Sequence, residues 1–393
     1  MRYTDDSLYP EKMAPLMITA APYGPAWLPG DAADIPVTWD EQVKMAVDCY
    51  TAGATILHLH VRNPATGALS AKIEHFNYLM ERIKKEVPEL IIQVGGSIAF
   101  DHPKDDGTVN WLSYDTRHML AEITPKPETV TVAIGTCMMD ITQSWTPDDI
   151  RGTHLEKDPK AMAAWAGMYT DAGPAFYLEH LKRLRKNGIQ PFFTLAHVHQ
   201  LEIVERLIRH GAYMGPLNSN ITIYGGGGCG HNPFDWMHWL QREPQGGTVH
   251  FWGSMRITAV AIPLGIILGQ HVRVGNEDNL WNSRRERMGT LQQIEAVVGL
   301  SERFGRKVAT AKEAREMMKI GVWYNSVDET LKNLGLPPNR GDDDRGFMVW
   351  ETDGKKSVAQ AMSDSHPMAY CMVPPDATQE TTKETRPLAG SRR

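Results

Sequence analysis

The sequence predicts an α/β protein, a (β/α)8 TIM barrel with an insertion after the fourth strand and a C-terminal extension. Three observations support this fold class. Eight short runs rich in apolar and β-branched residues recur along the 393 residues, and such runs are typical of parallel strands covered on both faces. Helical patterns separate the runs, as right-handed crossovers require. A barrel of this kind takes up about 250 residues before insertions, so the length accommodates it.

The predicted strands are the segments in which apolar residues run almost without interruption. Each is followed by a longer stretch with helical periodicity, so that eight βα units succeed one another along the chain. The runs are 16–21, 55–60, 90–95, 129–134, 191–196, 220–225, 248–253 and 271–275. Eight consecutive units of this kind close a barrel.

Helices between the strands are predicted from capping signals and apolar periodicity. Thr38 with Glu41, and Thr310 with Glu313, match the capping-box pattern at a helix N-terminus. Gly53 is expected to end the first of these helices. Two other helices carry apolar residues at three- and four-residue steps, which predicts core-facing stripes. The stripe residues are Phe76, Leu79, Met80 and Ile83 on one helix and Leu178, Leu181 and Leu184 on the other.

Two segments exceed what eight βα units require. Residues 136–173 form an insertion rich in Met, Trp and Tyr. It follows the fourth strand, at the end of the barrel where active sites lie, so we expect a lid or a pocket wall. The sequence therefore divides into a catalytic barrel, residues 1–321, and an irregular extension, residues 322–393, which we expect to pack on the barrel or on a neighbouring subunit.

Composition and charge exclude several classes of partner. The formal net charge is -6 at pH 7, whereas nucleic acid and anionic membranes require clustered Lys and Arg. The four cysteines lie far apart with no C-x-x-C pair, which predicts neither a disulfide framework nor a thiolate zinc site. The N-terminal segment is polar, and no apolar run approaches about 20 residues. We expect a cytoplasmic protein with a small-molecule ligand.

Two His-x-His pairs are candidate metal ligands. His58 and His60 alternate along a predicted strand, so both side chains point to one face, at the mouth of the barrel. His197 and His199 form a second pair just after the fifth predicted strand. Imidazole nitrogens suit Zn²⁺. Spacing alone leaves open whether either pair binds metal or consists of ordinary hydrogen-bonded histidines.

The eighth predicted strand carries ionisable residues at its exit. Arg273 lies within the strand, and Glu277 and Asp278 follow it. Buried ionisable groups are costly unless they pair or bind metal. A carboxylate beside two histidines would complete a metal site with open coordination positions, and Asp278 would serve as a base oriented by Arg273. The alternative is a structural Arg–Asp pair with a helix N-cap at Asp278 or Asn279.

Six motifs resemble the β-keto acid cleavage enzymes, the family of 3-keto-5-aminohexanoate cleavage enzyme. They are MITAAPYGP, GATILHLHVRNPATGALS, IIQVGG, KPETVTVAIGT, HVRVGNEDNLW and ATAKEAREMM. The resemblance covers residues 15–320. It implies a zinc-bearing barrel, usually a homotetramer, which condenses a β-keto acid with acetyl-CoA. A retro-Claisen cleavage then releases acetoacetate and a new acyl-CoA.

The resemblance also implies roles for individual residues. The zinc ligands of the family correspond to His58, His60 and Glu277. The general base corresponds to Asp278, and the arginine that assists it to Arg273. Two polar contacts to the substrate or an intermediate correspond to Thr131 on the fourth strand and Arg256 on the seventh.

The sequence departs from the family pattern around the substrate. A hydroxyl-rich turn usually ends the third strand, but here Gly95 and Gly96 occupy it and only Ser97 offers a hydroxyl. The acid that recognises the substrate ammonium of the aminohexanoate enzyme aligns with Ala26. An aminated β-keto acid is therefore a poor candidate substrate.

Several other residues are candidates for substrate binding. Tyr23 and Trp27 predict an aromatic wall after the first strand. His197 and His199 stand at the exit of the fifth strand and become candidates for substrate specificity. The run GGGGCGHN, residues 225–232, lacks the P-loop lysine and favours a flexible substrate loop over a nucleotide site.

Three functions are compatible with these residues. The first is a zinc-dependent β-keto acid cleavage enzyme that uses acetyl-CoA. The second is a zinc-dependent hydrolase or C–C lyase acting on a related β-dicarbonyl, amide or lactone without CoA, because glycines replace the usual hydroxyls. The third is a binding or scaffold protein with a residual site, which the retained ligand set disfavours.

Overall fold

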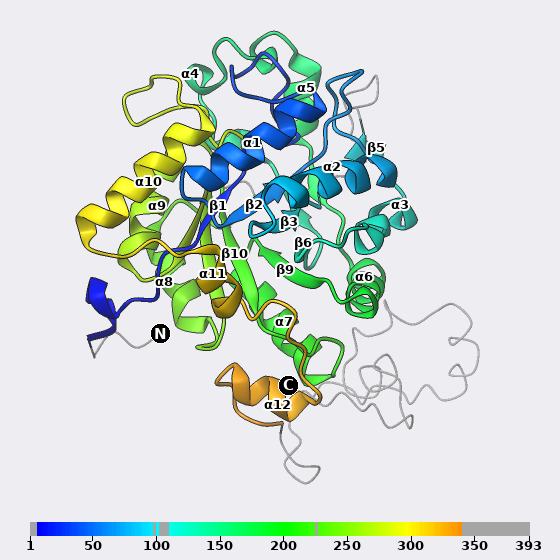
Figure 1. Ribbon diagram of the computed structural model, residues 1–393, viewed down its shortest axis with the longest axis vertical. Coiled ribbons are helices and arrows are strands. Elements are labelled where there is room, and N and C mark those ends of the chain that lie inside the picture. Colours follow the sequence, from blue (N-terminus) through cyan, green and yellow to red (C-terminus); the bar gives the residue numbers. More distant parts are fainter. Residues whose placement is uncertain (1–5, 97–99, 102–109, 225–226, 340–393) are drawn as a thin grey trace, which may run out of the picture. The chain divides into compact units, whose positions relative to one another are not determined.

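The computed structural model contains the closed parallel barrel that the sequence predicts (Figure 1). It describes residues 6–96, 100–101, 110–224 and 227–339. Each strand of the barrel overlaps one of the eight predicted runs, and all neighbouring strands within the barrel are parallel. Around the barrel the order is β1 (Ile18–Ala20), β12 (His271–Val274), β11 (Thr248–Gly253), β10 (Asn218–Ile223), β9 (Gln190–Leu195), β6 (Thr129–Ala133), β3 (Ile91–Val94) and β2 (Ile56–Leu59), which returns to β1.

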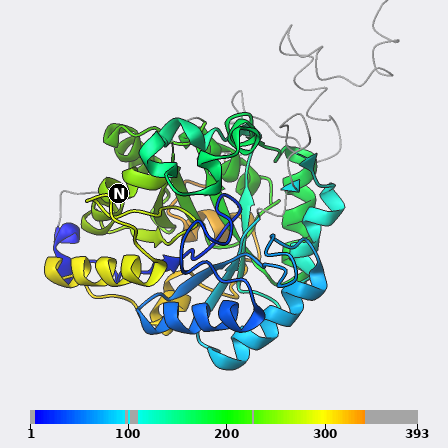
Figure 2. The ribbon, with the colours of Figure 1, turned by 90° about the horizontal axis from the view of Figure 1, so that it is seen from above.

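Helices surround the strands when the barrel is seen from above (Figure 2). The segment between β3 and β6 contributes a short helix, α3 (Tyr114–His118), and a 3-10 turn. The main outer helices are α1 (Trp39–Thr51), α2 (Ile73–Glu86), α6 (Pro174–Asn187), α7 (Val198–Arg209), α8 (Pro233–Arg242), α9 (Thr258–Ile267), α10 (Thr290–Phe304) and α11 (Ala311–Met317). No helix in the described part of the chain has the length and apolar character to cross a membrane.

The local signals in the sequence account for most helix boundaries. Both predicted capping boxes are present, before α1 and before α11. All four stripe residues of α2 are buried. On α6 the prediction was wrong for Leu178, which is 45% exposed. The buried face of α6 instead passes through Tyr177, His180, Leu181 and Leu184, and Leu178 lies off that stripe.

The insertion folds as a hairpin and two short helices that are fastened to the barrel. Its strands are β7 (Cys137–Met138) and β8 (Tyr169–Thr170), and its helices are α4 (Pro147–Ile150) and α5 (Pro159–Ala166). The buried carboxylate of Asp149 accepts a hydrogen bond from Arg256 Nε at 2.7 Å. His154 Nδ1 lies 2.6 Å from Asp31 Oδ2, on the loop after β1. These two contacts fix the insertion to the carboxyl ends of β1 and β11.

Residues Met1–Pro338 form one compact unit, and the rest of the predicted extension, from residue 340 on, lies outside the described residues. The sequence places residues 322–338 at the start of an irregular extension, yet they belong to this unit. Tyr324 is buried there, and residues 327–333 form α12 (Val327–Asn333), which contacts α7. Apolar side chains at these positions therefore extend the core of the barrel unit.

A pair of buried histidines lies inside the barrel. His250 on β11 and His271 on β12 have ring centroids 5.1 Å apart. His250 Nδ1 lies 3.1 Å from Thr19 Oγ1 on β1. The rings of His250 and Phe192, which lies on β9, form a T-shaped contact with their centroids 5.2 Å apart. Burial lowers the pKa of His250 to about 3 and holds the pKa of His271 well below its ordinary value. Both imidazoles are therefore neutral in the folded protein.

We expect the free energy of unfolding to fall as the pH drops from 6.5 towards 3. The folded state keeps His250 neutral, whereas in the unfolded chain the same imidazole takes up a proton below its ordinary pKa of 6.5. The contribution of neutral His250 to the free energy of unfolding is therefore fully present above pH 6.5 and is lost progressively as the pH falls below it. At pH 5 a histidine of this kind costs about 2 kcal/mol, from about 1.36 kcal/mol for each pH unit. Urea unfolding at pH 7.5 and pH 5 measures the difference. The difference in the free energy of unfolding between the two pH values should be smaller in His250→Gln. It should be unchanged in the control His238→Gln, because His238 lies on the exposed face of α8. An unchanged pH dependence in His250→Gln would contradict the prediction.

Candidate active site and metal centre

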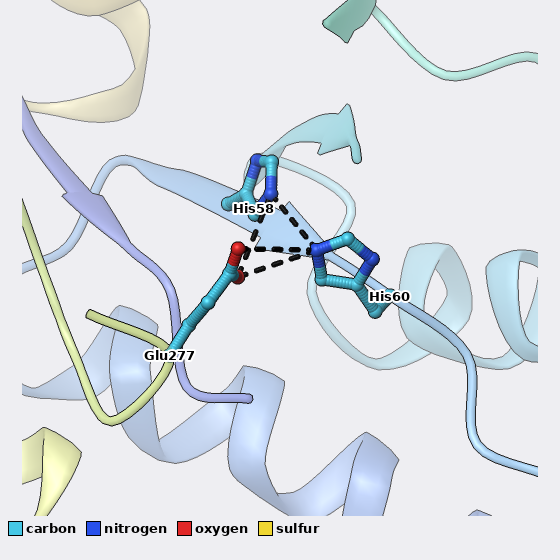
Figure 3. Close-up of side chains that lie close together, drawn as sticks. All are labelled: His58, His60 and Glu277. Atoms are coloured by element: carbon cyan, nitrogen blue, oxygen red, sulfur yellow. Dashed lines mark hydrogen bonds and ion pairs between the residues drawn. The ribbon is translucent and has the colours of Figure 1, made fainter. Parts of the chain in front are cut away.

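Two strand ends bring three candidate metal ligands together at the mouth of the barrel (Figure 3). His58 lies on β2 and His60 directly follows it, while Glu277 comes from the loop after β12. The two histidine Nε2 atoms are 3.1 Å apart. Glu277 Oε2 lies 3.5 Å from His58 Nε2 and 3.3 Å from His60 Nε2. Figure 3 shows both rings and the carboxylate directed at a common centre.

The donor set fits a divalent metal ion. Two imidazole nitrogens and a carboxylate oxygen lie within 4.8 Å of one another, the ligand types that zinc takes in catalytic sites with an open position. Glu277 Oε2 is buried and accepts no hydrogen bond from the described residues. Burial lowers the pKa of His58 to about 4, which keeps the ring in the neutral form that binds metal. The structure thus brings together the three residues that the sequence predicts as ligands, and their role as zinc ligands stays a prediction.

Two glycines make room for this centre. A Cβ atom on Gly95 would lie 2.3 Å from His60 Cε1 and 2.8 Å from His58 Nε2. A Cβ atom on Gly24 would lie 2.3 Å from Glu277 Cγ. Real Cβ atoms do not approach other atoms this closely, so a side chain at either position would displace a ligand. Gly95, which the sequence suggests only as a lost hydroxyl, is required by the packing of the histidine rings.

Gln93 on β3 orients His58. Gln93 Oε1 lies 2.7 Å from His58 Nδ1. Because the amide oxygen can only accept, Nδ1 carries the proton and the lone pair of Nε2 faces the metal centre. The sequence motifs do not single out Gln93. The available signal was a single polar side chain in the otherwise apolar run LIIQVG, two positions before Gly95.

Gln93→Leu should weaken metal binding by about 10- to 100-fold, the usual effect of removing the partner of a metal-bound histidine. The leucine keeps the side chain's volume but leaves Nδ1 of the buried His58 without an acceptor. Competition with a zinc-binding dye would measure the affinity. Gln93→Glu keeps an acceptor oxygen at the same position and should restore binding. If Gln93→Leu bound zinc as tightly as the wild type, the orienting role would be refuted.

Arg273 joins the two acids that follow β12. Its Nε and Nη2 atoms donate to the two carboxylate oxygens of Asp278 at 2.8 Å and 2.7 Å. Nη2 also lies 2.7 Å from Glu277 Oε1. The guanidinium lies over the ring of Trp252, 4.3 Å from its centroid. No helix begins at Asp278 or Asn279 in the described chain, because the next helix after β12 is α10, which starts at Thr290, so the N-cap part of the alternative was wrong.

The same arrangement gives the two acids different proton affinities. Burial raises the pKa of Asp278 to about 7, against the opposing effect of Arg273. Burial also disfavours the charged form of Glu277, but Arg273 and the two histidines hold its pKa well below the usual range. Glu277 is therefore an ionised ligand, and Asp278 is a carboxylate that can accept a proton near neutral pH.

A cavity opens beside these groups, and the insertion forms part of its wall. Trp27 lines it and donates from Nε1 to the backbone oxygen of Glu277 at 3.2 Å. Thr131 also lines it, but its hydroxyl already accepts from Gly96 N at 2.7 Å and contacts Val94 O at 3.3 Å. The insertion residues that line the cavity are Met139, Ile141, Trp145, Trp165 and Thr170.

Several residues expected at the substrate lie elsewhere. Tyr23 is buried beside the cavity lining, and its hydroxyl donates to Gln42 Oε1 at 3.2 Å. Arg256 binds Asp149 and Thr146, which fastens the insertion. These contacts assign both residues a supporting role.

The second histidine pair is also separate from the metal centre. His197 and His199 stack on each other with centroids 5.2 Å apart. Neither belongs to the residues that line the cavity or to the group of candidate ligands in the described chain. Ser97 lies outside the described residues.

The cavity also contains residues that the sequence analysis missed. Arg117 of α3 lies 3.9 Å from the centroid of the Phe176 ring of α6, and both line the cavity with His180. Arg117 Nη2 donates to the backbone oxygen of Asp171 at 2.5 Å, and Nη1 lies 3.5 Å from the carboxylate of Asp171. No motif marks these residues, because they meet only when α3, the insertion and α6 pack together.

Comparison with known proteins places the chain in a family. The family model for beta-keto acid cleavage enzymes matches residues 15–320. The 3-keto-5-aminohexanoate cleavage enzyme of Acetoanaerobium sticklandii is 28% identical over 313 residues, which cover 78% of this chain and 99% of the relative. The 3-dehydrocarnitine:acetyl-CoA trimethylamine transferase of Rhizobium meliloti is 22% identical and covers 78% and 96%.

A third relative and a solved structure extend the comparison. The 3-oxoadipate:acetyl-CoA acetyltransferase of Cupriavidus necator is 23% identical over 77% of this chain and 94% of the relative. The binary complex of ObcA with oxaloacetate superposes with a TM-score of 0.53 at 14% identity, over 73% of this chain and 67% of that one, which shows a shared fold. Because the family model matches well over half of the sequence, the protein belongs to the beta-keto acid cleavage enzyme family and is a C–C bond-cleaving acyltransferase rather than a binding scaffold.

Proposed function

We propose that the protein is a zinc-dependent enzyme that converts a β-keto acid and acetyl-CoA into acetoacetate and a new acyl-CoA. The observation that carries the proposal is the buried group of His58, His60 and Glu277, next to Asp278 and Arg273 in one cavity. The names of the curated relatives, which include acetyl-CoA transferases, support the kind of reaction. When bound, zinc polarises the 3-keto oxygen and stabilises the negative charge that develops there.

Asp278 supplies the base for the first step. Its carboxylate lines the cavity and can accept a proton from the carbon between the two carbonyl groups of the substrate. The resulting carbanion attacks the thioester carbonyl of acetyl-CoA, and the CoA thiolate leaves. Arg273 holds both oxygens of Asp278 throughout, which fixes the direction from which the proton is removed.

The second step is a retro-Claisen cleavage at the original 3-keto group of the condensed product. The CoA thiolate attacks the 3-keto carbon, and the bond between carbons 2 and 3 breaks. The acyl group leaves as the new acyl-CoA, and Asp278 returns its proton to carbon 2 of the departing acetoacetate. One acetyl group is thereby exchanged for the acyl group of the substrate, and no oxidant or water is consumed.

Acetoacetate formation with and without acetyl-CoA tests the proposal directly. A panel of β-keto acids should give acetoacetate and a new acyl-CoA only when acetyl-CoA is present. Stoichiometric zinc in the purified protein should accompany the activity. Cleavage that proceeds equally well without acetyl-CoA would instead identify a zinc-dependent hydrolase or C–C lyase. A substrate labelled with ¹³C at carbon 2 adds a second criterion, because the label must appear in acetoacetate.

The proposal includes a cytoplasmic homotetramer that binds neither nucleic acid nor membranes. The apolar helix α9 supports an association between subunits, because Val260 and Ile267 are exposed on it. Light scattering after gel filtration would determine the number of subunits.

A further inference from the structure

We infer that the side chain of the β-keto acid is an uncharged, apolar hydrocarbon group. This inference rests on the proposed function and names the substrate class for the same site. The cavity that receives the side chain is formed by aromatic and aliphatic groups, and its charged groups are already paired.

The wall away from the metal ligands is largely apolar. Three indole rings and three aliphatic side chains contribute to it: Trp27, Trp145, Trp165, Leu120, Met139 and Ile141. Trp27 and Trp145 pack on each other with centroids 5.2 Å apart. Their indole nitrogens donate to Glu277 O and Ser254 Oγ, so the polar atoms of both rings are engaged away from a ligand. Each methylene group that such a wall removes from water strengthens binding about fourfold.

An ammonium group on the substrate would lack a counter-ion. Within the described part of the chain, the carboxylates that line the cavity are Glu277 and Asp278. Both are bound to Arg273, and both lie at the metal centre. A buried cation without a partner carboxylate is strongly disfavoured.

A quaternary ammonium group would have to bind aromatic faces, but protein cations already occupy two of them. Arg117 lies over Phe176 at 3.9 Å and Arg273 lies over Trp252 at 4.3 Å. A third cation would stand beside two guanidinium groups as well as the metal. Of the other indoles, Trp27 and Trp145 are tilted by 34° and pack on each other, so this pair offers a hydrophobic surface rather than an open cage.

A second carboxylate on the substrate would need a free cation. Among the described lining residues away from Arg273, the arginine is Arg117, whose Nη2 donates to the backbone oxygen of Asp171 and whose Nη1 forms an ion pair with the Asp171 carboxylate at 3.5 Å. An anionic side chain would have to displace Asp171 from this buried contact. The wall therefore selects against either charge and in favour of apolar volume.

Three isosteric pairs of β-keto acids separate charge from shape. The first is 5-methyl-3-oxohexanoate with 3-keto-5-aminohexanoate, in which a methyl group replaces the ammonium. The second is 5,5-dimethyl-3-oxohexanoate with 3-dehydrocarnitine. The third is 6-methyl-3-oxoheptanoate with 3-oxoadipate. In each pair we expect the neutral acid to have a kcat/KM about 100-fold higher or more, from the cost of burying an unpaired charge. Titration of tryptophan fluorescence without acetyl-CoA should give the same order of affinity.

A pair of variants tests the charge of the wall itself. Ile141→Asp places a carboxylate beside the side-chain pocket, and Ile141→Asn places a group of the same size without charge. We compare kcat/KM for 3-keto-5-aminohexanoate with kcat/KM for 5-methyl-3-oxohexanoate. This ratio should be about tenfold higher or more in Ile141→Asp than in Ile141→Asn. Ile141 is only half-buried in a 3-10 turn of the insertion, so both variants should fold.

The outcomes distinguish this inference from the proposed function. Acetoacetate formation from any member of the panel with acetyl-CoA supports the reaction, whichever member is preferred. A charged acid that equals or exceeds its neutral isostere in both kcat/KM and affinity overturns the inference and leaves the reaction standing. If no acid reacts, the proposed reaction fails, and the fluorescence titration still decides which side chains the cavity binds.

Discussion

Replacing Glu277 by glutamine should remove zinc and catalytic activity together. The neutral amide of glutamine is a poor metal ligand, so only the two imidazoles would remain to hold the ion. Glu277→Gln also removes the ionic contact with Arg273 at 2.7 Å. Because the metal contributes several kcal/mol to the stabilisation of transition-state charge, kcat/KM should fall on the order of 1,000-fold. Metal analysis of the purified variant and steady-state kinetics on the same sample would measure both losses.

Matched variants make this experiment specific. Glu295→Gln makes the same chemical change on the exposed face of α10 and should leave zinc content and activity unaltered. His58→Ala should reproduce the loss seen in Glu277→Gln, while His197→Ala should retain the metal, because His197 lies outside the candidate ligand group of the described chain. Full activity and full zinc content in Glu277→Gln after dialysis against a chelator would refute the metal assignment.

The sequence predicts the metal centre because its geometry follows from local periodicity. Alternation along β2 sends His58 and His60 to one face, and parallel strands bring the exit of β12 to the same end of the barrel. Strand geometry therefore places His58, His60 and the exit of β12 at one end of the barrel. The family resemblance is what selects this histidine pair over His197 and His199 and assigns Glu277 as the third ligand. The bidentate pair of Arg273 and Asp278 is likewise local, since the two residues are only five positions apart.

The side-chain pocket could not be predicted in the same way, because its contacts join distant parts of the chain. Arg256 was expected at the substrate, but its partner Asp149 lies 107 positions away in the insertion. Arg117 and Phe176 meet only after α3 and α6 pack side by side. Such contacts depend on how the irregular insertion packs on the barrel. Neither hydrophobic periodicity nor a sequence motif determines this packing.

Gly95→Ala should abolish metal binding almost as completely as the loss of a ligand, although it removes no donor atom. The added methyl group would lie 2.3 Å from His60 Cε1 and 2.6 Å from His60 Nε2. His58 cannot move aside easily, because both rings are buried and Gln93 holds His58 at 2.7 Å. We expect the zinc affinity to fall more than about 100-fold, and stability to fall by about 1–3 kcal/mol from overpacking.

The control for this substitution is Gly299→Ala in α10, where an added Cβ atom meets nothing within 4 Å. That variant should keep its zinc and gain about 0.5–1 kcal/mol, since alanine favours the helix over glycine. Urea unfolding and zinc titration would be measured on both proteins. Wild-type zinc affinity in Gly95→Ala would mean that the ion does not require both rings in their present positions, and His60 would lose its place in the ligand set. A folded Gly95→Ala that cannot hold zinc would explain why glycine follows β3: the position is occupied by the imidazoles of the metal centre.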